Sequence, residues 1–341
     1  MLILLSLCIA TRNRLSSLRQ LLSELEDETT DIVELVIVDG ASTDGTQEFL
    51  RSYSNTRKNI RVVFEETNTG LDQGYEKCVY QARGSYCWLL SDDDQIIHGA
   101  IKEVLALLAT KRYDLVVANY EIWDKVFQKR LEAQCIPITN NTIFRPAELE
   151  ELFLMTASAL SFIGAVIIKK SVWMERERQQ YFNTWFIHLG VIFQKTFDQE
   201  VMVVSSPLIR VRYGVASWSD KAFEIWMDYW PTIIWSFSGI SESAKRLVTA
   251  RSPGGSVLKN LVFRGRGVSK ATAGRHVDLG SGAPRAMIEL IYWLPAKLSN
   301  VIVGFLCFLT IKRRRLILYD VANSPCAARL TKFFLDRSLR D

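Results

Sequence analysis

The sequence has few of the side chains that build zinc-type metal centres. Its three histidines and six cysteines show no metal-ligand spacing, and no two cysteines form a C-x-x-C pair. The cysteines are Cys8, Cys78, Cys87, Cys135, Cys307 and Cys326. This pattern argues against a His/Cys zinc site and predicts free thiols in a reducing compartment.

Two phosphate-binding fingerprints are also missing, because the chain contains neither the G-x-G-x-x-G pattern nor a P-loop. A signal peptide is not expected either. Residues 1–10 are apolar, but no basic residue precedes them and no small-residue cleavage site follows them. We therefore expect a buried first β-strand here, in a cytoplasmic protein.

Charge of one sign is not in large excess. The net charge is +5, with the surplus late in the chain, and we expect no nucleic-acid partner. Hydrophobic residues make up 48% of the 341 residues and charged residues 23%, which is typical of an ordered globular protein. A chain of this length forms one large domain with appendages, or two domains.

Residues 2–98 alternate between apolar runs and helical patterns. The predicted strands cover residues 2–9, 34–38, 60–64 and 86–90. Strands that alternate with helices imply a right-handed, mostly parallel α/β sheet flanked by helices. Further along, we expect helices over 100–108 and 171–178, and strands over 114–119 and 162–168.

Three carboxylates, Asp92, Asp93 and Asp94, follow the fourth predicted strand directly. Three adjacent like charges cost free energy unless a cation lies among them. Carboxylate and phosphate oxygens are ligands that hard divalent cations prefer. In open α/β sheets, ligands bind beyond the carboxyl ends of the strands. The alternative is a solvated acidic turn or a helix N-cap.

Polar residues also follow the other three strands. Thr11 and Arg14 follow the first, Asp39 ends the second, and Asn68 and Gly70 follow the third. An aspartate at such a place can accept hydrogen bonds from a base or a ribose hydroxyl, and an arginine can face a phosphate. The alternative for Asp39 is the N-cap of the next helix. The sequence therefore predicts a nucleotide site at one edge of the sheet.

These motifs resemble those of the family 2 glycosyltransferases, which have the GT-A fold. The resemblance covers residues 2–98, and it is based on Thr11–Arg14, Val36–Thr46, Gly84–Tyr86 and Ser91–Asp94. Gly70–Tyr75 and Trp88–Ser91 are similar to the O-antigen subgroup that includes abequosyltransferases.

The resemblance implies a role for each strand-end residue. Asp39 would bind the base or ribose, while Asp92 and Asp94 would form a DxD-type site for Mn²⁺ or Mg²⁺ and the diphosphate, with Asp94 catalytic. The implied nucleotide-sugar site comprises Thr11, Arg14, Asp39, Asn68, Gly70, Asp72, Asp92, Asp93 and Arg212.

The catalytic base departs from the family pattern, because no Glu-Asp pair occurs between residues 170 and 200. His188 is the candidate, since a neutral imidazole suits this role near pH 7. The alternative is a core histidine bonded to a backbone carbonyl. Asp198 and Glu200 are weaker candidates.

Residues 210–218 resemble the segment that closes the family's donor site, but they lack the histidine that some members use as a metal ligand. Arg212 would face the diphosphate or form a surface salt bridge. Trp218, Trp226, Trp230 and Trp235 suit sugar stacking or a helical core.

The last third of the chain predicts helices at a membrane surface. Residues 252–284 are rich in glycine and are interpreted as a loop or linker. Residues 286–311 are apolar, and their longest uncharged part, 298–311, is too short to span a bilayer comfortably. The basic residues 312–315 follow at once, which favours helices lying in the cytoplasmic leaflet. The alternative is a buried helix pair with a solvated basic end.

We therefore predict a GT-A domain over 1–220, with a nucleotide-binding half over 1–98 and an acceptor half over 99–220. A helical region over 221–341 would contact the membrane near 286–315. The hypothesis is a glycosyltransferase at the cytoplasmic face of the inner membrane. It would move a sugar, such as a dideoxyhexose, from a nucleotide diphosphate to a hydroxyl of an undecaprenyl-diphosphate-type oligosaccharide.

Two other functions stay open. A sugar nucleotidyltransferase would use a similar sheet and metal, but Thr11–Arg14 lacks the glycine of its phosphate loop. A membrane scaffold that binds the nucleotide sugar without turnover would need no base.

Overall fold

The computed structural model describes residues 2–26, 28, 30–215, 221–276, 283–310 and 314–339. The chain forms two compact units. The first comprises Met1–Ile122, Ala133–Arg212 and Phe237–Ala244. The second comprises Trp123–Glu132, Tyr213–Ser236 and Lys245–Asp341.

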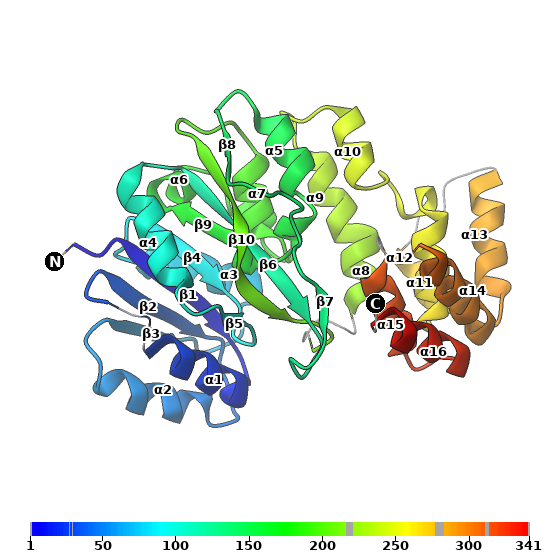
Figure 1. Cartoon of the computed structure of the whole chain (residues 1–341), viewed down its shortest axis with the longest axis horizontal. Helices are drawn as coiled ribbons and strands as arrows, with labels where there is room; N and C mark the ends of the chain where they lie inside the picture. The colour runs from blue at the N-terminus through cyan, green and yellow to red at the C-terminus, as the bar shows by residue number, and fades with distance from the viewer. Residues whose placement is uncertain are drawn as a thin grey trace. The chain divides into compact units, whose positions relative to one another are not determined.

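The first unit is built on a sheet with the strand order β3-β2-β1-β4-β9-β6-β10-β5, and β8 pairs with β10 (Figure 1). Its strands are β1 (Leu5–Thr11), β2 (Val33–Asp39), β3 (Ile60–Phe64), β4 (Tyr86–Leu90), β5 (Gln95–Ile96), β6 (Leu115–Trp123), β8 (Thr142–Phe144), β9 (Val166–Lys169) and β10 (Val201–Arg212). Strands β3, β2, β1 and β4 are parallel.

The rest of the sheet corrects the prediction of a mostly parallel sheet. Strand β9 is antiparallel to both β4 and β6, and β10 is antiparallel to β5 and β8. The sheet is therefore mixed. The regular alternation of strands and helices stops after β4, so the rule that favours parallel pairing no longer applies.

Helices flank the sheet in the first unit (Figure 1). They are α1 (Leu15–Glu26), α2 (Thr46–Asn55), α3 (Leu71–Gln81), α4 (Ala100–Thr110), α5 (Leu149–Thr156), α6 (Lys170–Met174) and α7 (Ile187–Phe193). The strand predicted over 162–168 begins only at Val166, after a 3-10 turn at Ile163–Ala165, and the helix predicted over 171–178 ends at Met174.

The parallel strands are apolar because both of their faces are covered. Every residue of β2 and of β4 is buried, as expected for strands with a layer on each side. Helix α1 contributes Leu18, Leu21, Leu22 and Leu25, the stripe that its leucine spacing predicts. The register places Thr11 beside Asp39 and Ile9 beside Leu90, so the carboxyl ends of the three strands are level.

The second unit is helical apart from β7 (Arg130–Glu132). Its helices are α8 (Ala222–Glu224), a π-helical turn (Ile225–Tyr229), α9 (Trp230–Ser236), α11 (Val257–Gly265), α12 (Lys270–His276), α13 (Ala283–Trp293), α14 (Ala296–Leu309), α15 (Arg315–Ala322) and α16 (Arg329–Ser338). Helix α10 (Glu242–Val248) begins in the first unit. The prediction of a loop over 252–284 is wrong, because α11 buries Val262 and Phe263 and α12 buries Ala273.

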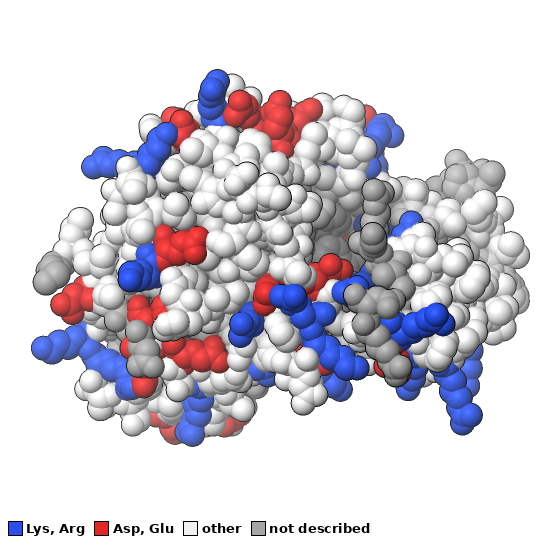
Figure 2. Space-filling model, viewed as in Figure 1, with Lys and Arg blue, Asp and Glu red and all other residues white. Residues whose placement is uncertain are grey.

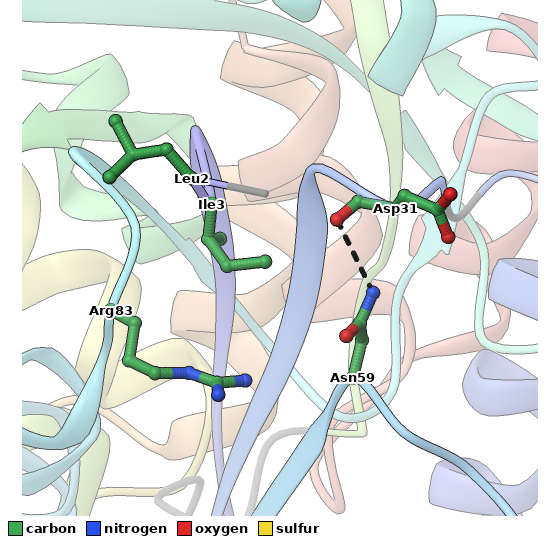
Figure 3. A pocket seen from close by; sticks show the side chains of 5 residues that line it. All are labelled: Leu2, Ile3, Asp31, Asn59 and Arg83. Atoms are coloured by element: carbon green, nitrogen blue, oxygen red, sulfur yellow. Dashed lines mark hydrogen bonds between the residues drawn. The ribbon is translucent and has the colours of Figure 1, made fainter.

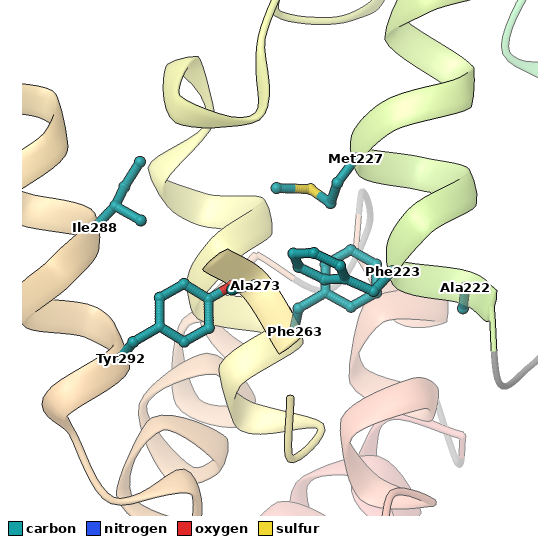
Figure 4. Packing of buried hydrophobic residues seen from close by; sticks show 7 residues of the cluster. All are labelled: Ala222, Phe223, Met227, Phe263, Ala273, Ile288 and Tyr292. Atoms are coloured by element: carbon teal, nitrogen blue, oxygen red, sulfur yellow. The ribbon is translucent and has the colours of Figure 1, made fainter. Parts of the chain in front are cut away.

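A hydrophobic cluster holds these helices together (Figure 4). It consists of Ala222, Phe223, Met227, Phe263, Ala273, Ile288 and Tyr292. The rings of Phe223 and Phe263 meet edge to face, with centroids 5.1 Å apart. Trp226 packs against the cluster and Trp230 is only 3% exposed, so both tryptophans are core residues, as the alternative to sugar stacking proposed.

Two short segments pack with the unit on the other side of the predicted boundary at residue 220. Phe237 belongs to the first unit, where its ring lies 6.3 Å from that of Phe153 and 5.7 Å from that of Phe193. Leu131 belongs to the second unit, where its carbonyl accepts a hydrogen bond from Arg315. Trp218 and residues 311–313, which carried further predictions, lie outside the described residues.

Candidate active site

The carboxylates after β4 lie beside the end of β1. Asp92 is 8% exposed, and its Oδ2 accepts a 2.6 Å hydrogen bond from the Thr11 hydroxyl. Asp93 is 9% exposed; its Oδ2 lies 2.7 Å from Nη1 of Arg14, and its Oδ1 accepts a hydrogen bond from the Ser91 hydroxyl. Two of the residues predicted after β1 are therefore in direct contact with the acidic residues predicted after β4.

Asp94 is held by the last residue of β10, a strand that is not adjacent to β4 in the sheet. Its Oδ1 accepts a 2.8 Å hydrogen bond from the backbone N–H of Arg212, the last residue of β10. The Arg212 side chain donates from Nη2 to Gln20. The backbone of Arg212 therefore contacts the acidic residues, and the prediction that its side chain faces the diphosphate stays a prediction.

Burial and mutual repulsion disfavour charge on these acids. Burial first, and then the neighbouring Asp93, raise the pKa of Asp92 to about 6, against the opposing effect of the bond from Thr11. Burial, and then Asp93, raise the pKa of Asp94 well above its usual range. A cation bound beside these carboxylates would relieve the repulsion between them.

The donor set fits a hard divalent cation such as Mn²⁺ or Mg²⁺. Asp92 and Asp94 each offer carboxylate oxygens, which such ions prefer. Among the residues that the structure describes, no three His, Cys, Asp or Glu side chains are grouped to hold a metal ion by themselves. Two aspartates would therefore share such an ion with oxygens from a ligand and from water.

Asp39 offers a buried acceptor at the end of β2. Its side chain is fully buried, and Oδ2 accepts hydrogen bonds from the Ser42 N–H at 3.0 Å and from Gln47 Nε2 at 2.8 Å. Its Oδ1 has no partner among the described residues. A buried oxygen without a partner is costly, so this oxygen is poised for a donor from outside the chain. Residue Gly45 is the N-cap of α2, so the N-cap alternative for Asp39 is wrong.

Side chains that the sequence did not single out join the two loops after β1 and β2. The Asn13 side-chain oxygen accepts a hydrogen bond from the Thr43 N–H, and the Asn13 backbone N–H donates to the Ser42 hydroxyl. The Asp44 carboxylate accepts from the N–H of Leu15, at the start of α1. The motif spacing contained these residues, but only the level strand ends show that the loops touch.

The loop after β3 reaches the same place. Asn68 is exposed, and its Oδ1 accepts a hydrogen bond from the Gly70 N–H. A Cβ atom at Gly40 would lie 3.2 Å from that Oδ1 and 3.6 Å from the Thr11 carbonyl. Gly40 thus allows three strand-end loops to meet, as their convergence predicted.

Residues 6–172 match the family described as glycosyl transferase family 2. The chain carries a family 2 glycosyltransferase domain. The protein is accordingly a glycosyltransferase, and the matched range contains the residues described above that follow β1, β2, β3 and β4, but not Arg212.

Individual relatives point the same way. The enzyme is 29% identical over 244 residues to abequosyltransferase RfbV of Salmonella typhimurium strain LT2, a match that covers 64% of this chain and 69% of that protein. A match at 24% identity to glycosyltransferase GlyG of Streptococcus pneumoniae covers 36% of this chain and 40% of that protein. Both relatives are glycosyltransferases by name, and the first is an abequosyltransferase.

Solved structures share the fold. Residues 1–349 of S. aureus TarS in complex with UDP-GlcNAc match with a TM-score of 0.57 at 16% identity, over 94% of this chain and 90% of that one. The complex of TarS with UDP matches with the same TM-score at 15% identity, over 99% of this chain and 89% of that one. These matches support the predicted GT-A-like arrangement of a sheet with flanking helices.

Asp72 lies in the first turn of α3, two residues after Gly70, and its predicted binding role stays a prediction. It is 4% exposed on α3, and its carboxylate accepts hydrogen bonds from the N–H groups of Trp185 at 2.9 Å and Ile187 at 3.1 Å. Burial raises its pKa to about 6, although these amides lower it. Asp72 therefore holds the entry to α7, where Trp185 has a positive φ of 70°.

The prediction of His188 as the base of the glycosyltransferase is corrected by its place in the core. The side chain is 1% exposed, and Nε2 lies 2.7 Å from the Leu160 carbonyl. Burial lowers the pKa of His188 to about 4. The alternative of a core histidine bonded to a backbone carbonyl matches this environment, and Nδ1 of the ring is buried without a partner among the described residues.

The weaker base candidates are also distant from the acids. Asp198 and Glu200 precede β10, whereas Asp94 bonds to Arg212 at the other end of that 12-residue strand. The Asp198 N–H donates to the Asp114 carboxylate, and Glu200 pairs with Lys111. Neither carboxylate can therefore reach the acids after β4.

A cavity of about 440 Å³ opens at the opposite edge of the sheet (Figure 3). It is lined by Leu2, Ile3, Asp31, Asn59 and Arg83. These residues precede the strands, and the guanidinium of Arg83 bonds to the buried Glu34. The cavity therefore lies at the opposite ends of the strands from Asp39 and Asp92.

Proposed function

We propose that the enzyme transfers a sugar from a nucleotide-diphosphate donor to a hydroxyl of a lipid-linked oligosaccharide. One observation carries the proposal: the buried Oδ1 of Asp39, without a partner in the described chain, lies at the same sheet edge as Asp92 and Asp94. That edge offers an acceptor for a nucleoside and an acidic site for a metal diphosphate. The complex of TarS with UDP-GlcNAc supports a donor of this class.

Different residues of the chain bind different parts of the donor. Asp39 accepts a hydrogen bond from the base or the ribose, and Gln47 fixes its orientation. Arg14 lies between the loops after β1 and β4 and can face a phosphate oxygen in place of Asp93. Asn68 and Gly70 border the same edge.

Asp92 and Asp94 would hold Mn²⁺ or Mg²⁺. Such a cation, when bound, supplies electrostatic stabilisation to the departing diphosphate. Thr11 and the Arg212 N–H fix the two carboxylates, so little reorganisation is needed when the donor binds.

The transfer forms a bond between the acceptor oxygen and the anomeric carbon, and it breaks the bond between that carbon and the diphosphate oxygen. The acceptor proton is released to a base other than His188, Asp198 or Glu200. The similarity to an abequosyltransferase favours a dideoxyhexose donor carried on CDP, and an undecaprenyl-diphosphate-type acceptor in O-antigen synthesis.

The test compares Asp94→Asn with the wild type in donor hydrolysis and sugar transfer. The asparagine keeps an oxygen for the Arg212 N–H but removes the charge, so we expect a rate loss of about 100-fold or more with the thermal midpoint retained. Asp336→Asn, a change in α16, is the matched control. Full activity of Asp94→Asn would refute the role of the acidic site. Release of pyrophosphate from a nucleoside triphosphate and a sugar phosphate would instead show a nucleotidyltransferase.

A further inference from the structure

Three helices of the second unit expose large apolar side chains on their outer sides. On α13 these are Met287, Leu290 and Trp293, on α14 Leu298, Phe305, Leu306 and Leu309, and on α16 Leu330 and Phe333. Trp293 is 74% exposed, Leu290 65% and Leu309 64%. We call these nine residues the outer apolar face. Isolated exposed leucines are ordinary, but sets at helical spacing on α13 and on the packed pair α14 and α16 mark an interaction surface.

The residues of α14 and α16 are contiguous. The ring of Phe334 on α16 packs against α14, with its centroid 6.1 Å from that of Phe305 and 4.8 Å from that of Phe308. The opposite sides of the helices are buried, through Ile288 and Tyr292 of α13, Val303 and Cys307 of α14, and Leu335 of α16. The helices are therefore apolar on both sides, and only one side is needed for folding.

The charge of the chain is divided between the two units. The segments of the second unit contain 22 Lys and Arg against 10 Asp and Glu, which gives +12. The first unit has 20 against 27, which gives −7, and the two values sum to the +5 of the whole chain. In Figure 2 the surface over α13 and α14 carries few charges, while Lys and Arg gather near α15 and α16.

We propose that the outer apolar face docks on an anionic lipid bilayer, with the helices lying in the plane of one leaflet. Apolar side chains enter the acyl boundary while Lys297, Arg329 and Lys332 reach the headgroups. The exposed Trp293 suits the interface, because its ring is apolar and its N–H is polar. This deepens the proposed function, on which it rests for its purpose, since a lipid-linked acceptor lies in such a leaflet.

An in-plane arrangement fits the helix lengths. Among the described residues, no single helix is long and apolar enough to cross a membrane. Helices α13 and α14 pass that test only as a pair, and they bend by 112° at the break between them. Docking in one leaflet needs no more length than either helix has.

Charge also favours a bilayer over a second copy of the chain. Two copies that met through this face would bring together two units of +12 each, which repel. An anionic bilayer attracts the same charge by about 1 kcal/mol per basic residue near the surface, or about fivefold in partition.

The experiment measures co-sedimentation of the full chain with vesicles of phosphatidylcholine, with and without phosphatidylglycerol. We expect strong binding to the anionic vesicles and weak binding to the neutral ones. Leu290→Ser with Trp293→Ser should weaken binding to anionic vesicles about tenfold or more, because both side chains lose burial in lipid. Lys297→Gln with Lys332→Gln should weaken it by about 25-fold, since two basic residues are lost.

Matched controls come from exposed residues of the first unit. Tyr80→Ser with Leu154→Ser, and Lys58→Gln with Lys102→Gln, should leave vesicle binding unchanged. Wild-type protein that ignores anionic vesicles would overturn the proposal. So would dimers in sedimentation velocity that dissociate in the Leu290→Ser, Trp293→Ser variant.

Two readouts separate this proposal from the proposed function. Donor hydrolysis in solution should survive the loss of vesicle binding in the Leu290→Ser, Trp293→Ser variant. Vesicle binding should survive the loss of hydrolysis in Asp94→Asn. A failure to bind vesicles would refute membrane docking but not donor hydrolysis. A failure to hydrolyse the donor would refute the proposed function but not vesicle binding.

Discussion

Asp39 is the residue where ligand binding and folding can be separated. Its Oδ2 accepts hydrogen bonds from Ser42 and Gln47 within the chain. Its buried Oδ1 has no partner among the described residues, so a ligand can bond to it. Asp39→Asn can keep the two internal bonds but presents an amide N–H₂ where the nucleoside needs an acceptor. We expect the Kd for the nucleoside diphosphate to rise about 10- to 100-fold, the usual value for a hydrogen bond to a charged group.

Calorimetric titration of Asp39→Asn with the diphosphate measures this effect. Its thermal midpoint should stay near that of the wild type, because no internal partner is lost. Unchanged affinity would show that Oδ1 does not face the donor.

His188 makes stability depend on pH. Burial lowers its pKa to about 4, against about 6.5 in an unfolded chain, so the unfolded state binds a proton that the folded state excludes. The stabilisation is present above pH 6.5 and is lost as the pH falls towards 4. Between pH 7 and pH 4 the wild type should lose about 3 kcal/mol more than His188→Gln, whose amide can still donate to the Leu160 carbonyl.

Urea unfolding of both proteins at several pH values checks this. His188→Gln should also retain most of its transfer activity at pH 7. Parallel stability curves, or a large loss of activity, would restore His188 as a titrating catalytic group.

The residues show which roles a sequence can assign. Asp39 ends a strand, and its position alone predicted its placement at the edge. Asp72 and His188 lie within helices, where spacing does not distinguish a cleft from the core. Their bonds to Trp185 and Leu160 join positions more than 25 residues apart, and no local pattern reports such contacts.

Helix α7 is an element whose ends are held by charged residues from elsewhere. Asp72 accepts the amides at its start, and Arg176 donates to the carbonyls of Val191 and Ile192 near its end. These charges complement the helix dipole. A helix of seven residues would be marginal without such partners.

Asp72→Asn should destabilise this element and spare the donor site. The two N–H groups bond to different oxygens of Asp72, and asparagine would present its N–H₂ to one of them, so we expect a loss of about 1–3 kcal/mol in the free energy of unfolding. Thermal unfolding and diphosphate titration test the prediction. Asp39→Asn is the control, because it should lose diphosphate affinity and keep its stability. A raised Kd without loss of stability would return Asp72 to the nucleotide-sugar site.

The elements of residues 2–98 were predictable because each strand is buried on both faces and ends in polar residues. Beyond them, β9 is four residues long and pairs antiparallel on both sides, which its apolar pattern cannot reveal. Helices α11 and α12 lie in a glycine-rich stretch. Their apolar residues pack on Phe223 and Met227 from far upstream, and that tertiary packing overrides the local signal.

At the scale of the whole molecule, the sequence predicted a catalytic region followed by a basic helical region. The structure has two units of opposite net charge, but β7 and its neighbours join the second unit because Arg315 bonds to Leu131. The donor site at the strand ends and the outer apolar face belong to different units. Each therefore has its own chemistry and can be tested without the other.

The central claim is that the strand-end loops bind a nucleoside diphosphate together with a divalent cation. Thermal unfolding with CDP, UDP, GDP or dTDP, each with and without Mn²⁺, tests it most directly, because a ligand that binds only the folded state raises its stability. We predict that one diphosphate stabilises the enzyme by about 2.7 kcal/mol at 100 times its Kd, only with Mn²⁺. The same shift should be lost in Asp39→Asn. No shift with any diphosphate, or an equal shift in Asp39→Asn, would contradict the claim.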